Sequence, residues 1–295
     1  MSLNFYIRTL DPKDIPQITD WSRIEGFAPG IGDVRIYQHT DKQGLWVGCL
    51  GDELIGCIAG VRYNPSYGFI GLFLVKQEQR GKGYGLSLWK HALTHLENIP
   101  CIGLEAAPDR IEDYSKWGFI PSSETTRWEY IGDGNLIQQN YNYINLDNLS
   151  VLNGLDIPSD AVQSYDARRE TTPRPHFLSD WLNNLEGNVL ALMDSKGSCH
   201  GFGRIRPCLL KEGKGWRIGP LIADTPELAE QLLSKLINKH PGKVLLDVPG
   251  LNPHAKKLLT NLGFHSISRT LRMYRGYQPP ISMSDVYGLA CLELG

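Results

Sequence analysis

The pattern of apolar and polar residues predicts alternating strands and helices along the first half of the chain. Short apolar runs between glycine, proline or charged residues are typical of strands, and apolar residues every three to four positions indicate an amphipathic helix. Strands are predicted at 7–11, 45–50, 54–63, 67–75, 101–106 and 119–131, and helices at 14–24, 81–98 and 110–118. The helix at 81–98 has an apolar stripe made of Leu86, Trp89, Ala92, Leu93 and Leu96. A meander of strands followed by alternating helices and strands predicts a mixed α/β sheet.

The second half of the chain repeats the same order of elements. Helices are predicted at 176–185, 226–240 and 252–263, and strands at 189–194, 201–209, 216–223, 243–248 and 267–276. Landmark residues recur 145 positions apart: Gly56 with Gly201, Gly118-Phe119 with Gly263-Phe264, and Arg127 with Arg272. A shared offset through a strand, a helix and a further strand indicates two copies of one unit. We therefore expect an N-terminal domain at 1–140 and a degenerate C-terminal domain at 141–295, joined through a polar segment at about 132–165.

The composition excludes several other classes of protein. The 295 residues suffice for two domains, and 41% hydrophobic with 21% charged residues excludes a mainly disordered chain. The formal net charge of -2 argues against a protein that coats nucleic acid. The N-terminal residues lack the apolar core of a secretion signal, and no apolar run is long enough to cross a membrane. We expect a cytoplasmic protein with no nucleic-acid or membrane partner, and the sequence leaves its oligomeric state open.

Neither the cysteines nor the histidines form a recognisable metal site. None of the six cysteines falls in a C-x-x-C pair, and all lie in or beside apolar stretches, which predicts buried free thiols. His91 and His95 have the four-residue spacing of metal ligands on a helix, but no glutamate directly follows His91 and no third ligand is evident nearby. A solvated helix face is the more ordinary explanation of this pair, and no metal is expected.

A glycine-rich turn between a strand and a helix is the most informative segment. The strand ending at Val75 is followed by a charged turn and then by Arg80-Gly-Lys-Gly-Tyr-Gly85, which opens the helix. Glycines let the main chain approach a ligand closely, and the start of a helix presents unpaired N–H groups and about half a positive charge. Arg80 and Lys82 add cationic side chains. Such a turn suits a pyrophosphate group.

Two motifs together resemble the GNAT N-acetyltransferase superfamily. Arg80-x-x-Gly83-x-Gly85 after the strand at 67–75 looks like its acetyl-CoA motif, and Tyr114-Ser-Lys-Trp-Gly118-Phe119 resembles its Tyr-x-x-x-Gly-Phe ending of the helix after the next strand. The segment 25–33, the phrases IGPL and RMYRG, and the repeat itself resemble a subgroup with two GNAT domains in tandem. The resemblance implies the GNAT fold in two copies, with acetyl-CoA as the co-substrate of the first.

The resemblance also implies roles for residues of the first copy. The main chain of Phe73, Leu74 and Val75 would align the pantetheine arm, and an N–H group there would stabilise the negative charge that develops on the thioester oxygen. The pyrophosphate would be held by the main-chain amides of Gly81, Lys82, Gly83, Tyr84 and Gly85, with Arg80 beside them. Tyr114 would act as general acid near the sulfur, since a phenol of pKa about 10 can protonate a thiolate of pKa about 8.5 if the site tunes either value. Packing against one helix face is the alternative role of Tyr114.

Carboxylates near the predicted site are candidates for taking the proton of the acceptor's ammonium group. Glu105 lies at the C-terminal end of its strand, where ligands gather in such sheets. Glu25 and Asp33 lie in a loop rich in glycine and proline beside the first helix, where substrate contacts are expected. Asp33 is a candidate for contact with the acceptor, and a surface or capping carboxylate is the alternative for both residues. A direct base and one that acts through water both remain open. The candidates for acceptor contacts from the second copy are Arg206, Asp247 and Asn252, which are otherwise a surface charge, a turn residue and a helix cap.

The second copy lacks both motifs. Its corresponding helix start reads Ala223-Asp-Thr-Pro-Glu227, where proline offers no N–H group and the acidic side chains would repel a pyrophosphate. Leu259 stands at the position of Tyr114. We therefore expect no CoA at the second copy, which instead builds part of the acceptor pocket.

The leading hypothesis is an N-acetyltransferase that transfers an acetyl group from acetyl-CoA to a primary amine by direct attack. The acceptor is a small-molecule amine or the amine of a protein or peptide. A non-catalytic module that binds acyl-CoA is the first alternative. A transferase that uses charged tRNA is the second, and the net charge of -2 disfavours it.

Overall fold

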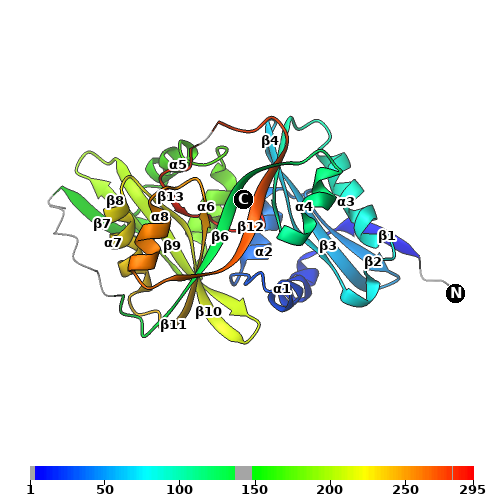
Figure 1. The fold of residues 1–295 in the computed structure, drawn as a ribbon, viewed down its shortest axis with the longest axis horizontal. Coiled ribbons are helices and arrows are strands. Elements are labelled where there is room, and N and C mark those ends of the chain that lie inside the picture. The colour runs from blue at the N-terminus through cyan, green and yellow to red at the C-terminus, as the bar shows by residue number, and fades with distance from the viewer. Residues whose placement is uncertain (1–3, 137–147, 281) are drawn as a thin grey trace.

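One mixed sheet runs through the whole molecule, with helices on both of its faces (Figure 1). The computed structural model describes residues 4–136, 148–280 and 282–295. The strands are β1 (Phe5–Thr9), β2 (Leu45–Leu50), β3 (Glu53–Asn64), β4 (Tyr67–Val75), β5 (Cys101–Ala106), β6 (Ile120–Gly132), β7 (Leu149–Asn153), β8 (Asn188–Asp194), β9 (Cys199–Leu210), β10 (Gly213–Ala223), β11 (Gly242–Pro249), β12 (His265–Gly276) and β13 (Val286–Gly288). The α-helices are α1 (Ile15–Ile24), α2 (Asp33–Thr40), α3 (Tyr84–His95), α4 (Ile111–Ser115), α5 (Ser159–Ala167), α6 (Pro175–Asn183), α7 (Pro226–Ile237) and α8 (Ala255–Asn261). This is the mixed α/β fold that the sequence pattern predicts.

The two halves of the chain exchange strands. The sheet order is β1-β2-β3-β4-β5-β12-β6-β11-β10-β9-β8-β7, with β13 paired to β10. β12, from the second half, therefore lies between β5 and β6, and β6 pairs in turn with β11. Figure 1 shows β6 and β12 crossing the middle of the molecule side by side, between two lobes. Each lobe of the sheet is thus completed by a strand from the other half of the chain. The expected domain boundary between 140 and 141 lies outside the described residues.

Each lobe buries apolar side chains on both faces of the sheet. In the first lobe, α3 and α4 cover one face, while α1, α2 and α6 cover the other together with the C-terminal segment 289–295. The apolar stripe of α3 differs from the prediction, because Leu88 is buried whereas Leu86 is 49% exposed. In the second lobe, α7 and α8 cover one face and α5 and α6 the other. All six cysteines are buried, as predicted.

The sheet opens in the first lobe because β4 and β5 part. They run parallel and pair from Tyr67 to Ile70 of β4, and the pairing then stops. The register of β4 with β3 shifts at this point, and Leu72 takes a left-handed φ of 46°. A bulge of this kind bends a strand away from its neighbour. The main chain of 73–75 is therefore left without a strand partner on the β5 side.

The second lobe has the same opening, but the chain itself fills it. β10 and β11 pair in parallel from Trp216 to Ile218, and the register of β10 with β9 then shifts before Leu221. β13 pairs with β10 at Leu221 and Ile222, and the N–H group of Leu289 donates to the carbonyl oxygen of Asp247 at 2.8 Å. The open edge that is free in the first lobe is therefore occupied by protein in the second.

Gly71, at the bulge of β4, provides a test of how tightly the C-terminal segment 289–295 is seated. A Cβ atom at this position would overlap the carbonyl oxygen of Glu293. We expect Gly71→Ala to lower the free energy of unfolding by about 1–3 kcal/mol, because the segment must move to relieve the overlap. Urea unfolding of the variant measures this effect, and an unchanged midpoint would mean that the segment adapts without cost.

Candidate active site

A cavity of about 710 Å³ lies where β4 and β5 part. It brings together three groups of residues that the sequence singles out. These are Phe73, Leu74 and Val75 of β4, Arg80, Gly81 and Gly85 of the glycine-rich turn, and Tyr114, Glu105 and Glu25. Lys82, Gly83 and Tyr84 lie on the same turn without lining the cavity. The arrangement places an open strand edge, a helix start and a phenol around one space.

The glycine-rich turn presents free main-chain donors. Gly81 and Gly83 take left-handed φ values of 75° and 88°, and a Cβ added at either would meet nothing within 4 Å. Gly83 is the N-cap of α3, so the first N–H groups of that helix face outward. Within the described residues, the amides of 81–85 donate no hydrogen bond to protein. The turn therefore has the open surface and the unpaired donors that an anionic group such as a pyrophosphate needs.

The Arg80 side chain is 45% exposed but is held by two contacts with the protein. Its Nε atom donates to the carbonyl oxygen of Val75 at 2.8 Å, and its Nη2 atom pairs with Oε1 of Glu25 at 2.5 Å. These contacts tie the turn to the end of β4 and to the end of α1. Glu25, predicted as a base, is thus already engaged by a cation at the rim of the cavity.

Tyr114 is held in the cavity wall by the end of α4. Gly118 takes a left-handed φ of 83°, which ends the helix, and the N–H group of Phe119 bonds back to the carbonyl oxygen of Tyr114 at 3.3 Å. The phenol ring packs 5.1 Å from Trp89 and 6.4 Å from Phe119, centroid to centroid. Burial raises the pKa of Tyr114, so the phenol keeps its proton at neutral pH. The helix end at Gly118 and the aromatic packing therefore set the position of the ring, and burial keeps the phenol protonated.

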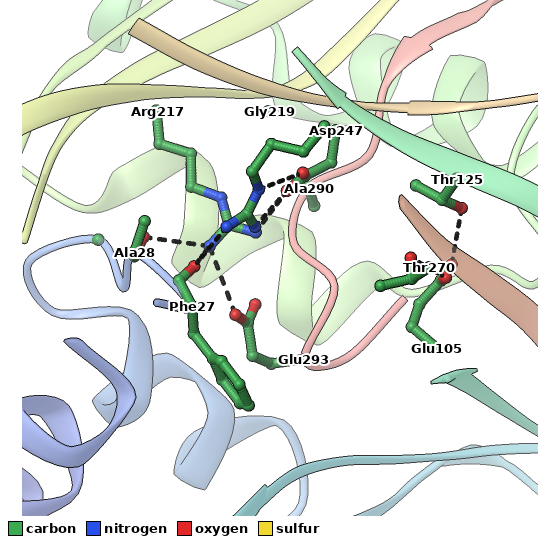
Figure 2. A network of polar contacts seen from close by, with 12 residues as sticks. Phe27, Ala28, Glu105, Thr125, Arg217, Gly219, Asp247, Thr270, Ala290 and Glu293 are labelled. Carbon is green, nitrogen blue, oxygen red and sulfur yellow. Dashed lines mark hydrogen bonds and ion pairs between the residues drawn. The ribbon is translucent and has the colours of Figure 1, made fainter. Parts of the chain in front are cut away.

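Glu105 lines the cavity but is fully engaged. Its Oε1 atom accepts from Arg272 Nε at 2.7 Å and from Thr125 Oγ1 at 3.0 Å, and its Oε2 atom accepts from Thr270 Oγ1 at 2.7 Å. Figure 2 shows this carboxylate directed at Thr125 and Thr270. Both oxygen atoms of Glu105 are therefore already occupied by contacts with β6 and β12. Glu105 is better placed to order β5, β6 and β12 than to activate an acceptor.

Two predicted acceptor contacts, Asp33 and Arg206, instead pair with each other. Both side chains are fully buried, and Arg206 donates to both carboxylate oxygens of Asp33 from Nε and Nη2 at 3.0–3.2 Å. Arg206 also donates to the carbonyl oxygens of Gly219 and Ala290. Neither residue lines the cavity. They join α2 to β9 at the junction of the two halves.

Asp247, another predicted acceptor contact, is also buried. Its carboxylate pairs with Arg217 at 2.7 Å, both residues being labelled in Figure 2, and with Arg127 at 2.7 Å. Arg217 also donates to the carbonyl oxygens of Phe27 and Ala28. Asn252 caps the turn before α8, accepting from the N–H groups of 254 and 255. These residues serve the structure, and we assign them no contact with the acceptor.

The buried ion pairs follow the repeat. Arg127 of β6 crosses to Asp247 of β11, and Arg272 of β12 crosses to Glu105 of β5, each at 2.7 Å. Arg127 and Arg272 are the two landmarks that recur 145 positions apart. Each exchanged strand therefore carries an arginine to a carboxylate on the other half of the chain. The pairs explain why these two positions keep the same residue in both copies.

The second copy has an ordinary helix start in place of the glycine-rich turn. Thr225 is the N-cap of α7, and its Oγ1 atom accepts from the N–H group of Leu228 at 3.4 Å. Asp224 is engaged by Arg169 at 2.6 Å and by His200 at 2.8 Å. Leu259 is buried in the core under α8. The sequence differences thus correspond to structural uses of the same positions.

One functional candidate escapes sequence reasoning. Glu293 lines the cavity from the C-terminal segment, although it lies far from the glycine-rich turn along the chain. Its approach depends on β13 and on the path of the last residues, which no periodicity in 277–295 predicts. Arg127 also lines the cavity, and the sequence marks it only as a landmark of the repeat.

The histidine pair and the helices add two smaller observations. His91 and His95 both lie edge-on to Trp46. The Nε2 atom of His95 bonds to Asp41 at 3.1 Å, and the His95 side chain is 13% exposed. The expectation of a solvated helix face is therefore wrong for His95. In the described part of the chain, each helix is too short or too polar to cross a lipid bilayer.

Comparisons with known proteins agree with this architecture. A model of the acetyltransferase (GNAT) family matches residues 15–119, and a model of the acetyltransferase (GNAT) domain matches residues 162–288. A protein named holothin acyltransferase, from Pseudoalteromonas sp. (strain SANK 73390), is 29% identical over 281 residues, covering 94% of this chain and 90% of the relative. The uncharacterized N-acetyltransferase YitH of Bacillus subtilis (strain 168) is 20% identical over 273 residues, covering 88% of this chain and 85% of the relative.

Solved structures share the fold over nearly the whole chain. A protein from Pyrococcus horikoshii assigned as an acetyltransferase superposes with a TM-score of 0.80 at 21% identity, covering 99% of this chain and 96% of that one. A tandem GNAT protein from the clavulanic acid biosynthesis pathway superposes with a TM-score of 0.61 at 14% identity, covering 92% and 98%. The predicted fold, with two GNAT units, is confirmed. The chain belongs to the GNAT acyltransferases and carries two GNAT domains in tandem.

Proposed function

We propose that the first copy binds acetyl-CoA and transfers its acetyl group to a primary amine on a small molecule. The observation that carries the proposal is the meeting of free turn amides, an open strand edge and Tyr114 around one cavity. The small-molecule acceptor is supported by the relative named holothin acyltransferase, which aligns over 94% of this chain. The filled opening of the second lobe supports a single acyl-CoA site.

The residues of the chain have separate parts in this reaction. The amides of 81–85 would hold the pyrophosphate of the donor, and the free edge of β4 at 73–75 would align its pantetheine arm. An N–H group on that edge would stabilise charge on the thioester oxygen as the amine attacks. Tyr114 would then give its proton to the departing thiolate. Bound donor supplies the activated acyl group, and the chain supplies position, charge stabilisation and protons.

The glycine-rich turn gives the direct test of the donor site. We expect Gly83→Glu to weaken acetyl-CoA binding more than tenfold, because a carboxylate would stand where the pyrophosphate is held and would repel it. Isothermal titration calorimetry with acetyl-CoA measures the affinity. Gly197→Glu is the matched control, because Gly197 has a similar φ of 81° and equally open surroundings in the turn between β8 and β9.

Three results would count against the donor site. If Gly83→Glu bound acetyl-CoA as tightly as the wild type, the pyrophosphate would lie elsewhere. If Gly197→Glu lost affinity to the same degree, the cause would be strain in a left-handed glycine and not the added charge. A wild-type protein that is folded and binds no acetyl-CoA would end the proposal.

A further inference from the structure

We propose that Glu293, on the C-terminal segment 289–295, receives the ammonium group of the acceptor and takes its proton. The inference rests on the proposed acyl transfer and adds the group that activates the acceptor. It also gives the second copy a part in the reaction, because the residue comes from the segment that follows β13. The carboxylates predicted for this role, Glu25 and Glu105, are engaged by arginines.

Glu293 differs from the other carboxylates of the cavity in its bonding. Glu105 accepts three bonds of 2.7–3.0 Å, and Glu25 and Asp109 lie at the exposed rim beside Arg80 and Arg110. Glu293 is only 5% exposed, yet its two partners are distant. Tyr37 Oη donates to Oε2 at 3.3 Å, and Arg217 Nη1 donates to Oε1 in a long ion pair of 3.5 Å, compared with 2.5–2.7 Å for the ion pairs of Glu25 and Glu105. Among the carboxylates that line the cavity, Glu293 is thus the buried one whose oxygen atoms can still accept shorter hydrogen bonds.

The charges around Glu293 leave room for a cation. The charged and titratable groups that surround it are Arg217 of β10, Arg127 of β6, Asp247 of β11, Asp33 and Tyr37 of α2, and Cys291 of its own segment. Arg127 and Arg217 both form ion pairs with Asp247 at 2.7 Å, a shorter distance than the 3.5 Å between Arg217 and Glu293. Arg206 forms its ion pair with Asp33. Buried carboxylates require a counter-charge or several hydrogen bonds. The ammonium group of an acceptor in the cavity would supply both to Glu293.

The neighbouring groups hold fixed protonation states at neutral pH. Burial raises the pKa of Tyr37 well above its ordinary value, and burial raises the pKa of the Cys291 thiol to about 12. Both groups therefore stay neutral while the arginines stay charged. Neither the neutral phenol nor the neutral thiol is therefore a group that can take the acceptor's proton.

The segment that carries Glu293 is anchored along its length. The N–H group of Leu289 bonds to the carbonyl oxygen of Asp247, and Arg206 donates to the carbonyl oxygen of Ala290 at 3.1 Å. Tyr63 Oη donates to the carbonyl oxygen of Leu294 at 3.0 Å. β13, just upstream, fills the opening of the second lobe. One stretch of chain thus closes the second opening and holds a carboxylate in the cavity of the first, which gives the preorganisation that catalysis needs.

The step balances as follows. One proton passes from the acceptor's ammonium group to Glu293, and the neutral nitrogen forms a bond to the thioester carbonyl carbon. The C–S bond breaks, and Tyr114 protonates the departing thiolate. The nitrogen loses a second proton as the amide forms, and that proton restores the phenol of Tyr114. Glu293 then releases its proton to water, leaving the amide and the free CoA thiol as products.

The test compares charged amines with hydroxylamine, an amine that is largely uncharged at neutral pH. Release of CoA from acetyl-CoA is measured with hydroxylamine and with benzylamine and putrescine. We expect Glu293→Gln to lower kcat/KM for the charged amines by about 10²–10⁴-fold, the usual contribution of a general base. Transfer to hydroxylamine and the affinity for acetyl-CoA should change little, because glutamine keeps the size of the side chain. In this variant kcat/KM for the charged amines should rise about tenfold per pH unit up to the pKa of the amine, because only the neutral amine can then attack.

Control variants separate a chemical role from a structural one. Glu97→Gln makes the same change at an exposed position after α3 and should match the wild type with both kinds of amine. Glu293→Asp keeps the charge and should recover part of the lost rate. Equal loss with hydroxylamine and charged amines, or a loss of acetyl-CoA affinity in Glu293→Gln, would show a structural role and overturn the inference. An unchanged pH profile, or a wild type that acetylates only hydroxylamine, would overturn it too. A wild type that binds no acetyl-CoA would instead overturn the proposed function on which it rests.

Discussion

Replacing Tyr114 with phenylalanine is expected to lower kcat by about 10²–10⁴-fold while the affinity for acetyl-CoA stays unchanged. Phenylalanine keeps the ring contacts with Trp89 and Phe119, so the wall of the cavity remains in place. The only loss is the hydroxyl proton that would protonate the thiolate. Because burial raises the pKa of Tyr114, the rate of the wild type should not fall through loss of this proton at any pH below about 10.

The measurement is steady-state kinetics with CoA detection, alongside calorimetry with acetyl-CoA. Tyr130→Phe is the matched control, because Tyr130 is a partly buried tyrosine that packs 5.1 Å from Phe264 in the core of the second lobe. A full rate in Tyr114→Phe would assign the leaving-group proton to another donor. A wild type that binds acetyl-CoA and acetylates no amine would favour the alternative of a non-catalytic acyl-CoA binding module.

The glycine-rich turn and the junction after Tyr114 could be predicted from the sequence because their signals are local. The turn at 80–85 and the Tyr114 to Phe119 spacing each lie within one strand-to-helix or helix-to-strand junction. Glycines at left-handed φ values mark both junctions, and only a few residue types tolerate that conformation. Such positions can be recognised in the sequence without knowledge of the rest of the fold.

The contacts of the candidate acceptor residues could not be predicted, because they form between distant segments. Asp33 in its loop and Asp247 at its strand end are predicted to contact the acceptor, but each pairs with an arginine from the other half of the chain. The pairing of Asp247 with Arg127 depends on the exchange of strands, and that of Asp33 with Arg206 on the packing of α2 against β9; periodicity reveals neither. Glu293 is another case, because three-residue β13 is too short to produce a pattern. The recurrence of arginine at 127 and 272 is the feature of the sequence that corresponds to the exchange of strands.

Replacing Asp247 with asparagine is expected to give the largest loss of stability, about 3–5 kcal/mol, as is typical when one partner of a buried ion pair is removed. Asp247 is 1% exposed and is the shared counter-ion of Arg127 and Arg217. Asparagine would leave both guanidinium groups buried beside a neutral amide. Because Arg127 comes from an exchanged strand, the loss should loosen the junction of the halves. Urea unfolding measures the effect, and Asp113→Asn, which removes an exposed partner of Lys116, should leave the midpoint nearly unchanged.

The pH dependence of the same variant checks that the effect is electrostatic. Burial alone would raise the pKa of Asp247, but the charges of Arg127 and Arg217 outweigh it and hold the pKa well below its ordinary value of about 3.9. A carboxyl group with a lowered pKa in the folded state stabilises the fold above its unfolded pKa, and this contribution is lost as the pH falls below about 4. The stability difference between wild type and Asp247→Asn should therefore be constant from pH 7 to 5 and shrink below pH 4. A difference that stays constant down to pH 2 would mean that asparagine disturbs packing and that the charge of Asp247 does not hold the two arginines in place.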